Sequence, residues 1–125
     1  MLRAHPHLIE INARLWLKDL RKKYAMADMT LSTVPDDEFA TWQRLGFTHI
    51  WLMGAWTTGP RARDLALSDP GLMAAYDELL PRWRKNDIGG SPFSVAAYEV
   101  PAALGGESGL KKFRARLHAH GLKLV

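Results

Sequence analysis

The amino-acid sequence predicts an α/β fold in which helices connect parallel strands. Residues 47–53 form an almost wholly apolar run, which is typical of a strand that helices cover on both faces. Residues 9–17 alternate between apolar and other side chains, and residues 110–117 carry apolar side chains at helical spacing. The predicted order is strand, helix, strand, long connection, helix and strand. This order favours parallel strands with helical crossovers, and it fits both an open sheet and a closed barrel.

The first strand is predicted over residues 9–17 because its apolar side chains recur at every second position. These positions are Ile9, Ile11, Ala13, Leu15 and Leu17. A polar loop is expected to follow it through residues 22–28.

A helix is predicted over residues 35–45. Pro35 suits its first turn, and the acidic residues at 36–38 suit the positive end of the helix dipole. Phe39 and Trp42 lie three positions apart and predict the buried face, which Leu45 extends. Gly46 is expected to end the helix.

Residues 54–106 form a long connection rich in glycine and proline, in which a short helix is predicted over residues 71–80. Its apolar side chains are Leu72, Tyr76, Leu79 and Leu80. Long loops that follow the C-terminal ends of strands carry the sites of α/β proteins. We therefore expect the functional residues in this connection.

The last helix presents Leu110, Phe113 and Leu117 on one face, and Gly121 is expected to end it in a left-handed turn. Residues 122–125 then begin an apolar run that predicts a further strand. Because domains usually end in polar or frayed segments, we expect the chain to be the front part of a larger protein.

The charge and composition of the chain argue against nucleic-acid and membrane partners. The 125 residues carry a net charge of +4 and no cysteine. The densest basic cluster lies on the last helix, where a solvated helix face explains it better than nucleic-acid binding does. The sequence contains no apolar run of about 20 residues, and its N-terminus does not resemble a signal peptide. We expect a cytoplasmic protein without nucleic-acid or membrane partners, cofactors or metals.

Two segments resemble the N-terminal part of the α-amylase family, glycoside hydrolase family 13. The first is FTHIWLMG at residues 47–54, and the second is GSPFSVAAYEVPAALGG at residues 90–106 with the helix and strand that follow. The resemblance implies a partial (β/α)8 TIM barrel, with about the first three strands and a long loop after the second. Residues 1–125 would then be an N-terminal fragment of the catalytic domain.

The resemblance also implies substrate-binding residues. Phe93 stands where the family has a sugar-stacking tyrosine, Tyr98 keeps the second tyrosine of the motif, and Ala97 replaces its aspartate. Trp56 and Trp83 are further candidates, because flat aromatic rings contact the apolar faces of sugars. Trp56 could instead pack beneath the loop, and Trp83 could form cation–π contacts with its basic neighbours. The other tryptophans, Trp16, Trp42 and Trp51, are predicted to lie in the core.

No catalytic residue is expected within the chain. A retaining glycosidase needs two carboxyl groups about 5–5.5 Å apart, and the family places them on later strands than those present here. Asp64 in GPRARD departs from the family's Gly-x-Arg-x-Asp motif and is predicted to be a loop charge. His49 is predicted to be a hydrogen-bonded core residue. The chain alone is expected to be inactive, although its parent family cleaves or transfers α-glucosidic bonds.

Two further expectations follow. Three of eight barrel strands would leave an open sheet edge, through which copies of the chain can associate. The alternative function, from another class, is a non-catalytic α/β module that binds carbohydrate or protein.

Overall fold

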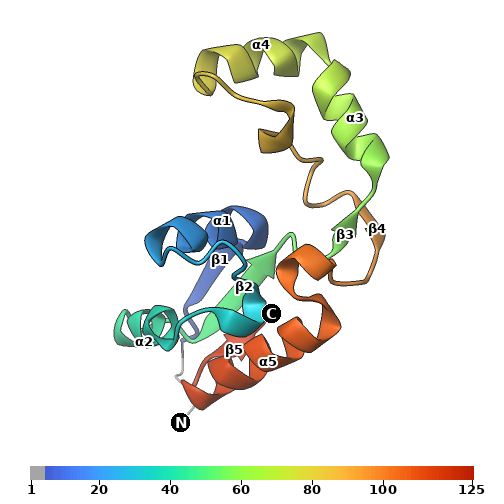
Figure 1. Ribbon diagram of the computed structural model, residues 1–125. Helices are drawn as coiled ribbons and strands as arrows, with labels where there is room; N and C mark the ends of the chain where they lie inside the picture. The colour runs from blue at the N-terminus through green and yellow to red at the C-terminus, as the bar shows by residue number, and fades with distance from the viewer. Residues whose placement is uncertain (1–4) are drawn as a thin grey trace. The chain divides into compact units, whose positions relative to one another are not determined.

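The computed structural model describes residues 5–125, which form a mixed α/β fold divided into two compact units (Figure 1). The first unit comprises the described residues up to Ala55 together with Glu99–Val125, and the second is Trp56–Tyr98. No helix among the described residues is long and apolar enough to cross a bilayer.

A parallel three-stranded sheet lies at the centre of the first unit. Its strands are β1 (Leu8–Asn12), β2 (His49–Met53) and β5 (Lys123–Leu124), in the order β1-β2-β5. Leu8 pairs with His49, which pairs on its other side with Lys123. The predicted parallel arrangement with helical crossovers is therefore confirmed.

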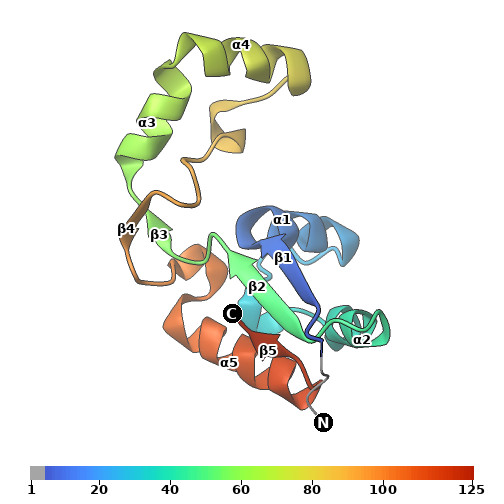
Figure 2. The ribbon, with the colours of Figure 1, turned by 180° about the vertical axis from the view of Figure 1, so that it is seen from behind.

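The core occupies one face of this sheet. Ile50 and Leu52 of β2 are buried, and Ile9 and Ile11 of β1 pack against the same cluster. In Figure 1 both strands lie behind α1 (Ala13–Lys23), and in Figure 2 they face the viewer. The alternate residues of β2 are only half-buried, so the expectation that β2 is fully covered on both faces was wrong.

The first predicted strand was too long, because α1 begins at Ala13. The side chain of Asn12 accepts a hydrogen bond from the Leu15 N–H, which caps the helix. Ala13, Leu17 and Leu20 form its buried stripe. Ala13 and Leu17 are four residues apart, so they satisfy both the strand and the helix period. The polar loop predicted from residue 22 therefore starts only after Lys23.

The helix predicted over residues 35–45 is confirmed as α2 (Asp36–Arg44), which follows a short 3-10 turn, η1 (Leu31–Thr33). Phe39 and Trp42 are buried as predicted. Leu45 does not extend their face: it follows the last helical residue and is 63% exposed.

The last helix, α5 (Gly106–Ala119), follows the 3-10 turn η3 (Ala102–Leu104). Phe113 and Leu117 are fully buried on its predicted apolar face. The chain leaves the helix through Gly121 in the left-handed region, with a φ of 71°, as expected.

Two arginines form hydrogen bonds between the helices and the loops of the first unit. Arg116 of α5 donates from Nη2 to Asp36 Oδ1 at 2.7 Å and from Nη1 to the Ser32 carbonyl at 3.2 Å. Arg21 of α1 donates from Nε to the Met29 carbonyl at 2.9 Å and from Nη2 to the Ala103 carbonyl at 3.1 Å. Segments that are distant in the sequence are thus joined by charge-assisted hydrogen bonds.

The second unit has its own small sheet and two consecutive helices. Strands β3 (Thr57–Thr58) and β4 (Val95–Ala97) pair antiparallel. The predicted helix is confirmed as α4 (Pro70–Leu79), and it is followed by the 3-10 turn η2 (Lys85–Asp87). The preceding helix, α3 (Pro60–Ser68), was not expected.

The returning segment of the second unit packs on α3. Arg63 donates from Nε to the Ile88 carbonyl at 3.0 Å and from Nη2 to the Lys85 carbonyl at 2.8 Å. Ile88 is buried, whereas neither α3 nor α4 buries a residue. A Cβ on Gly90 would lie 2.7 Å from Ala62 Cβ, so glycine permits this close approach.

Candidate functional site

Trp56 and Tyr98, two of the predicted sugar-binding residues, meet in the second unit. The ring centroids of Trp56 and Tyr98 are 5.6 Å apart, and the ring planes form an angle of 82°, an edge-to-face contact. Tyr98 is 78% exposed and Trp56 is 37% exposed. The pair therefore presents aromatic surface to solvent, although most of the surface of Trp56 is covered, so its packing beneath the loop remains the alternative.

The short β3–β4 ribbon brings these two rings together across 42 positions of sequence. Thr57 of β3 pairs with Ala97 of β4. Trp56 directly precedes Thr57 and Tyr98 directly follows Ala97, so the two rings come from facing positions of the antiparallel pair. Facing positions on an antiparallel pair bring side chains within contact distance. Trp56 also follows the last residue of β2 by three positions, in the connection where a site was expected.

Phe93, the third predicted residue, belongs to the loop before β4. Its ring is 68% exposed, and its N–H donates to Ser91 Oγ at 3.3 Å. Of the aromatic ring contacts within residues 5–125, none joins Phe93 to Trp56 or Tyr98.

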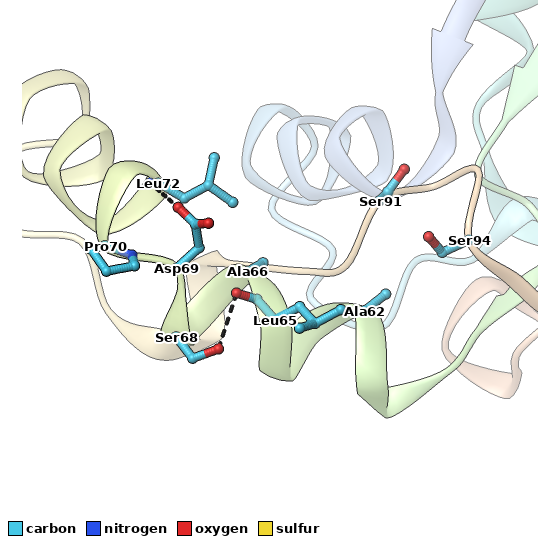
Figure 3. Close-up of a pocket in the computed structure, with 9 residues that line it drawn as sticks. All are labelled: Ala62, Leu65, Ala66, Ser68, Asp69, Pro70, Leu72, Ser91 and Ser94. Atoms are coloured by element: carbon cyan, nitrogen blue, oxygen red, sulfur yellow. Dashed lines mark hydrogen bonds between the residues drawn. The ribbon is translucent and has the colours of Figure 1, made fainter.

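A shallow pocket of about 590 Å³ lies where α3 meets α4 and the loop before β4 (Figure 3). Its apolar part comes from α3 and the start of α4, and two serines of the loop lie opposite. The lining residues are Ala62, Leu65, Ala66, Ser68, Asp69, Pro70, Leu72, Ser91 and Ser94. This pocket was not predicted from the sequence, because one of its walls is the helix α3, which was not expected.

Two polar side chains of the pocket, those of Ser68 and Asp69, have structural roles. Asp69 Oδ1 accepts from the Leu72 N–H at 2.9 Å and so caps α4. Ser68 Oγ donates to the Leu65 carbonyl at 3.3 Å at the end of α3. Both bonds are drawn in Figure 3.

Trp83 is positioned differently from Trp56. Its Nε1–H donates to Asp77 Oδ1 at 2.8 Å, and its ring centroid lies 5.4 Å from that of Tyr76 in an edge contact. These contacts attach the turn after α4 to the helix. They give Trp83 a structural role, so Trp56 is the better candidate for sugar contact.

The carboxylates of the second unit also stabilise turns and helix ends. Asp87 Oδ2 accepts from the Arg84 N–H at 2.8 Å, Asp77 is bonded to Trp83, and Asp69 caps α4. Asp64 is exposed on α3, not in a loop as predicted. The described residues contain no group of three His, Asp or Glu side chains arranged to hold a metal ion.

The shifted pKa values belong to the first unit. Hydrogen bonds from Arg116 hold the pKa of Asp36 below its usual value, and the hydrogen bond to Glu38 raises the pKa of Tyr24. Tyr24 OH donates to Glu38 Oε1 at 2.7 Å. The Nδ1 of His49 lies 2.8 Å from Thr48 Oγ1, which confirms the predicted hydrogen bond. The prediction that His49 lies in the core was wrong, because its side chain is only half-buried.

Comparison of the chain with protein-family models, with curated proteins and with solved structures finds no match.

Proposed function

We propose that the chain is the N-terminal, three-strand part of an α-amylase-like (β/α)8 barrel and contributes to the rim of an α-glucan site. The resemblance of residues 47–54 and 90–106 to that family supports this proposal. The fold is compatible with this proposal, since β1, β2 and β5 are parallel and lie side by side in the sheet in the order in which they occur along the chain. The same order occurs in half of an open doubly wound sheet, and the motif residues are what favour the barrel in this proposal.

The contact between Trp56 and Tyr98 is the observation that carries the functional part. Sugars bind to flat aromatic surface that is combined with polar groups, and this pair offers an exposed indole and an exposed phenol in contact. Phe93 adds a third exposed ring in the same unit. The proposed substrate is an α-glucan or a maltooligosaccharide, and none of these residues performs the bond cleavage.

The experiment is a calorimetric titration of the 125-residue chain with maltooligosaccharides. We expect weak, saturable binding, with a Kd of roughly 1 mM, because few groups contact the sugar. Tyr98→Ala should weaken binding at least about tenfold, whereas Leu45→Ala, at a 63% exposed position of the first unit, should leave it unchanged. Binding that is absent, or that is equally strong in both variants, would refute the proposed site.

The same preparation should not hydrolyse maltooligosaccharides or an aryl α-glucoside, because the two carboxyl groups of the retaining mechanism are not supplied by these strands. Hydrolysis by pure chain would overturn this assignment.

The alternative function is a self-sufficient, non-catalytic module that binds carbohydrate or protein. It is favoured by the exposed aromatic pair and by the structural roles of the nearby carboxylates. The barrel proposal predicts association through β1 and β5, the two edges of the described sheet, in a cytoplasmic protein. Saturable sugar binding by a monomer that melts cooperatively would favour the module instead.

A further inference from the structure

The second unit has little buried apolar surface of its own. Of residues 56–98, all of which the structure describes, only Ile88 is buried. A segment of about 40 residues with so small a core is at the limit of what folds by itself. The closed form of this unit therefore depends on the contacts that hold its two ends together.

The β3–β4 ribbon joins these two ends and is itself short. Its strands have two and three residues, and its register shifts between Thr57 and Thr58. An isolated two-stranded ribbon is at best marginally stable in water. Much of its stability must therefore come from side chains at facing positions of the two strands.

Trp56 and Tyr98 are the first and last residues of the second unit, and they flank the pair formed by Thr57 and Ala97. Their rings are in contact where the chain enters and leaves the unit, with centroids 5.6 Å apart. An edge-to-face aromatic pair stabilises a structure beyond the effect of its buried area. The two chain ends cannot separate at this point without breaking the ring contact.

The rest of the second unit is connected to the ribbon through α3. The helix begins directly after Gly59, where a Cβ would lie 3.3 Å from Ala96 Cβ of β4. Arg63 of α3 in turn donates to the Ile88 carbonyl on the returning segment at 3.0 Å. Separation of the two strands of the ribbon therefore also loosens the returning segment from α3.

We propose that the Trp56–Tyr98 ring pair holds the second unit closed, and that a ligand in contact with both rings stabilises this closed form. The role of the ring pair concerns the chain alone, whereas the effect of the ligand rests on the proposed sugar function. A maltooligosaccharide that contacts both rings binds only when the two chain ends lie side by side. At about ten times its Kd, it lowers the population of the open form about 11-fold.

Native-state hydrogen exchange at residues 57, 58, 95 and 97, the paired residues of the ribbon, measures the open population. Tyr98→Ala removes the ring contact and should accelerate exchange of the protected amides among them roughly 2- to 10-fold. Tyr98→Phe keeps an aromatic ring in place and should exchange as the natural chain does. Ribbon amides without protection, unchanged exchange in Tyr98→Ala, or equal acceleration in Tyr98→Phe would overturn the proposal.

Tyr76→Ala is the matched control within the same unit. The Tyr76 ring makes a similar edge contact with Trp83, with centroids 5.4 Å apart, but it belongs to α4 and not to the ribbon. Its removal should leave exchange of the ribbon amides unchanged. Acceleration as large as that in Tyr98→Ala would indicate a general loosening of the unit and would contradict the specific role of the ring pair.

The effect of the ligand is measured on the natural chain with maltooligosaccharide at about ten times the Kd found by calorimetry. The ribbon amides should exchange about 11-fold more slowly. The Tyr24 amide, bonded to the Leu20 carbonyl at the end of α1, exchanges by fraying of that helix end and should not change.

The outcomes separate this inference from the proposed function. Saturable sugar binding without slower ribbon exchange would overturn the effect of the ligand and leave the sugar-binding function standing. Faster ribbon exchange in Tyr98→Ala, in a chain that binds no sugar, would support the role of the ring pair and refute the proposed function.

Discussion

Replacing Gly90 by alanine tests whether the returning loop of the second unit is packed on α3. The added Cβ would lie 2.7 Å from Ala62 Cβ and 2.9 Å from the Arg63 backbone nitrogen. Ordinary van der Waals contact begins near 3.4 Å, so the loop or the helix must yield by about 0.7 Å at Ala62 Cβ and by about 0.5 Å at the Arg63 backbone nitrogen. Overpacking of this kind costs about 1–3 kcal/mol, which corresponds to a roughly 5- to 150-fold larger population of the open loop.

Native-state hydrogen exchange measures this population residue by residue. The amides of Asp87 and Ile88, which are bonded within η2, should exchange roughly 5- to 150-fold faster in Gly90→Ala. The Val125 amide, bonded to the Ile50 carbonyl, is the reference in the first unit and should not change. Gly59→Ala is the control variant, because its Cβ would meet Ala96 Cβ at the milder distance of 3.3 Å. Unchanged exchange in Gly90→Ala would refute the packing of residues 85–90 on α3.

Three further predictions concern the first unit. Phe113→Ala should lower the free energy of unfolding by about 3–5 kcal/mol in urea titrations, because its fully buried ring contacts Phe39 and Trp16; a loss below about 1 kcal/mol would contradict the core. The pKa of Asp36 is depressed from 3.8, so its ion pair with Arg116 stabilises the fold above that pH, and this contribution is lost as pH falls through the lower folded value. Arg116→Met should therefore flatten the acid limb of the stability profile, and an unaltered limb would count against the pair. The pKa of Tyr24 is raised from 10.0, so its bond to Glu38 stabilises the fold below that pH and is lost as pH rises through the folded value. Glu38→Gln should lower this pKa toward 10.0 in an absorbance titration.

Helices that have a periodic apolar face and clear end signals could be predicted from the sequence. The acidic first turn, Phe39 and Trp42 predicted α2, and Phe113 and Leu117 with Gly121 predicted α5 and its end. The parallel sheet followed from the apolar run at β2, since such runs occur where helices connect strands.

The errors arose where a local pattern fits two structures. Ala13 and Leu17 satisfy both the strand and the helix period, and the choice depends on the cap formed by Asn12 and on burial of Leu20. The helix α3 was missed because Gly59, Pro60 and the charged residues after them were interpreted as a loop, although proline also suits the first turn of a helix. The pocket beside α3 was missed for the same reason.

The residues of the candidate site were predicted partly from the family resemblance and partly from the chemistry of their side chains. The resemblance drew attention to Tyr98 and Phe93, and the chemistry of aromatic rings drew attention to Trp56. Their pairing could not be predicted, because the β3–β4 ribbon that joins Trp56 to Tyr98 has only two and three residues in its strands. Such short strands carry almost no periodic signal.

The central claim is that an α-glucan contacts the chain at Trp56 and Tyr98. The chain has five tryptophans, so a nitrogen–proton correlation spectrum separates five indole N–H signals, assigned by Trp→Phe variants. During titration with maltooligosaccharide, we expect the Trp56 indole signal to shift progressively and to saturate, while the Trp83 signal, bonded to Asp77, stays in place. A shift of Trp83 without Trp56, or no shift of any indole at saturating sugar, would contradict the proposed site.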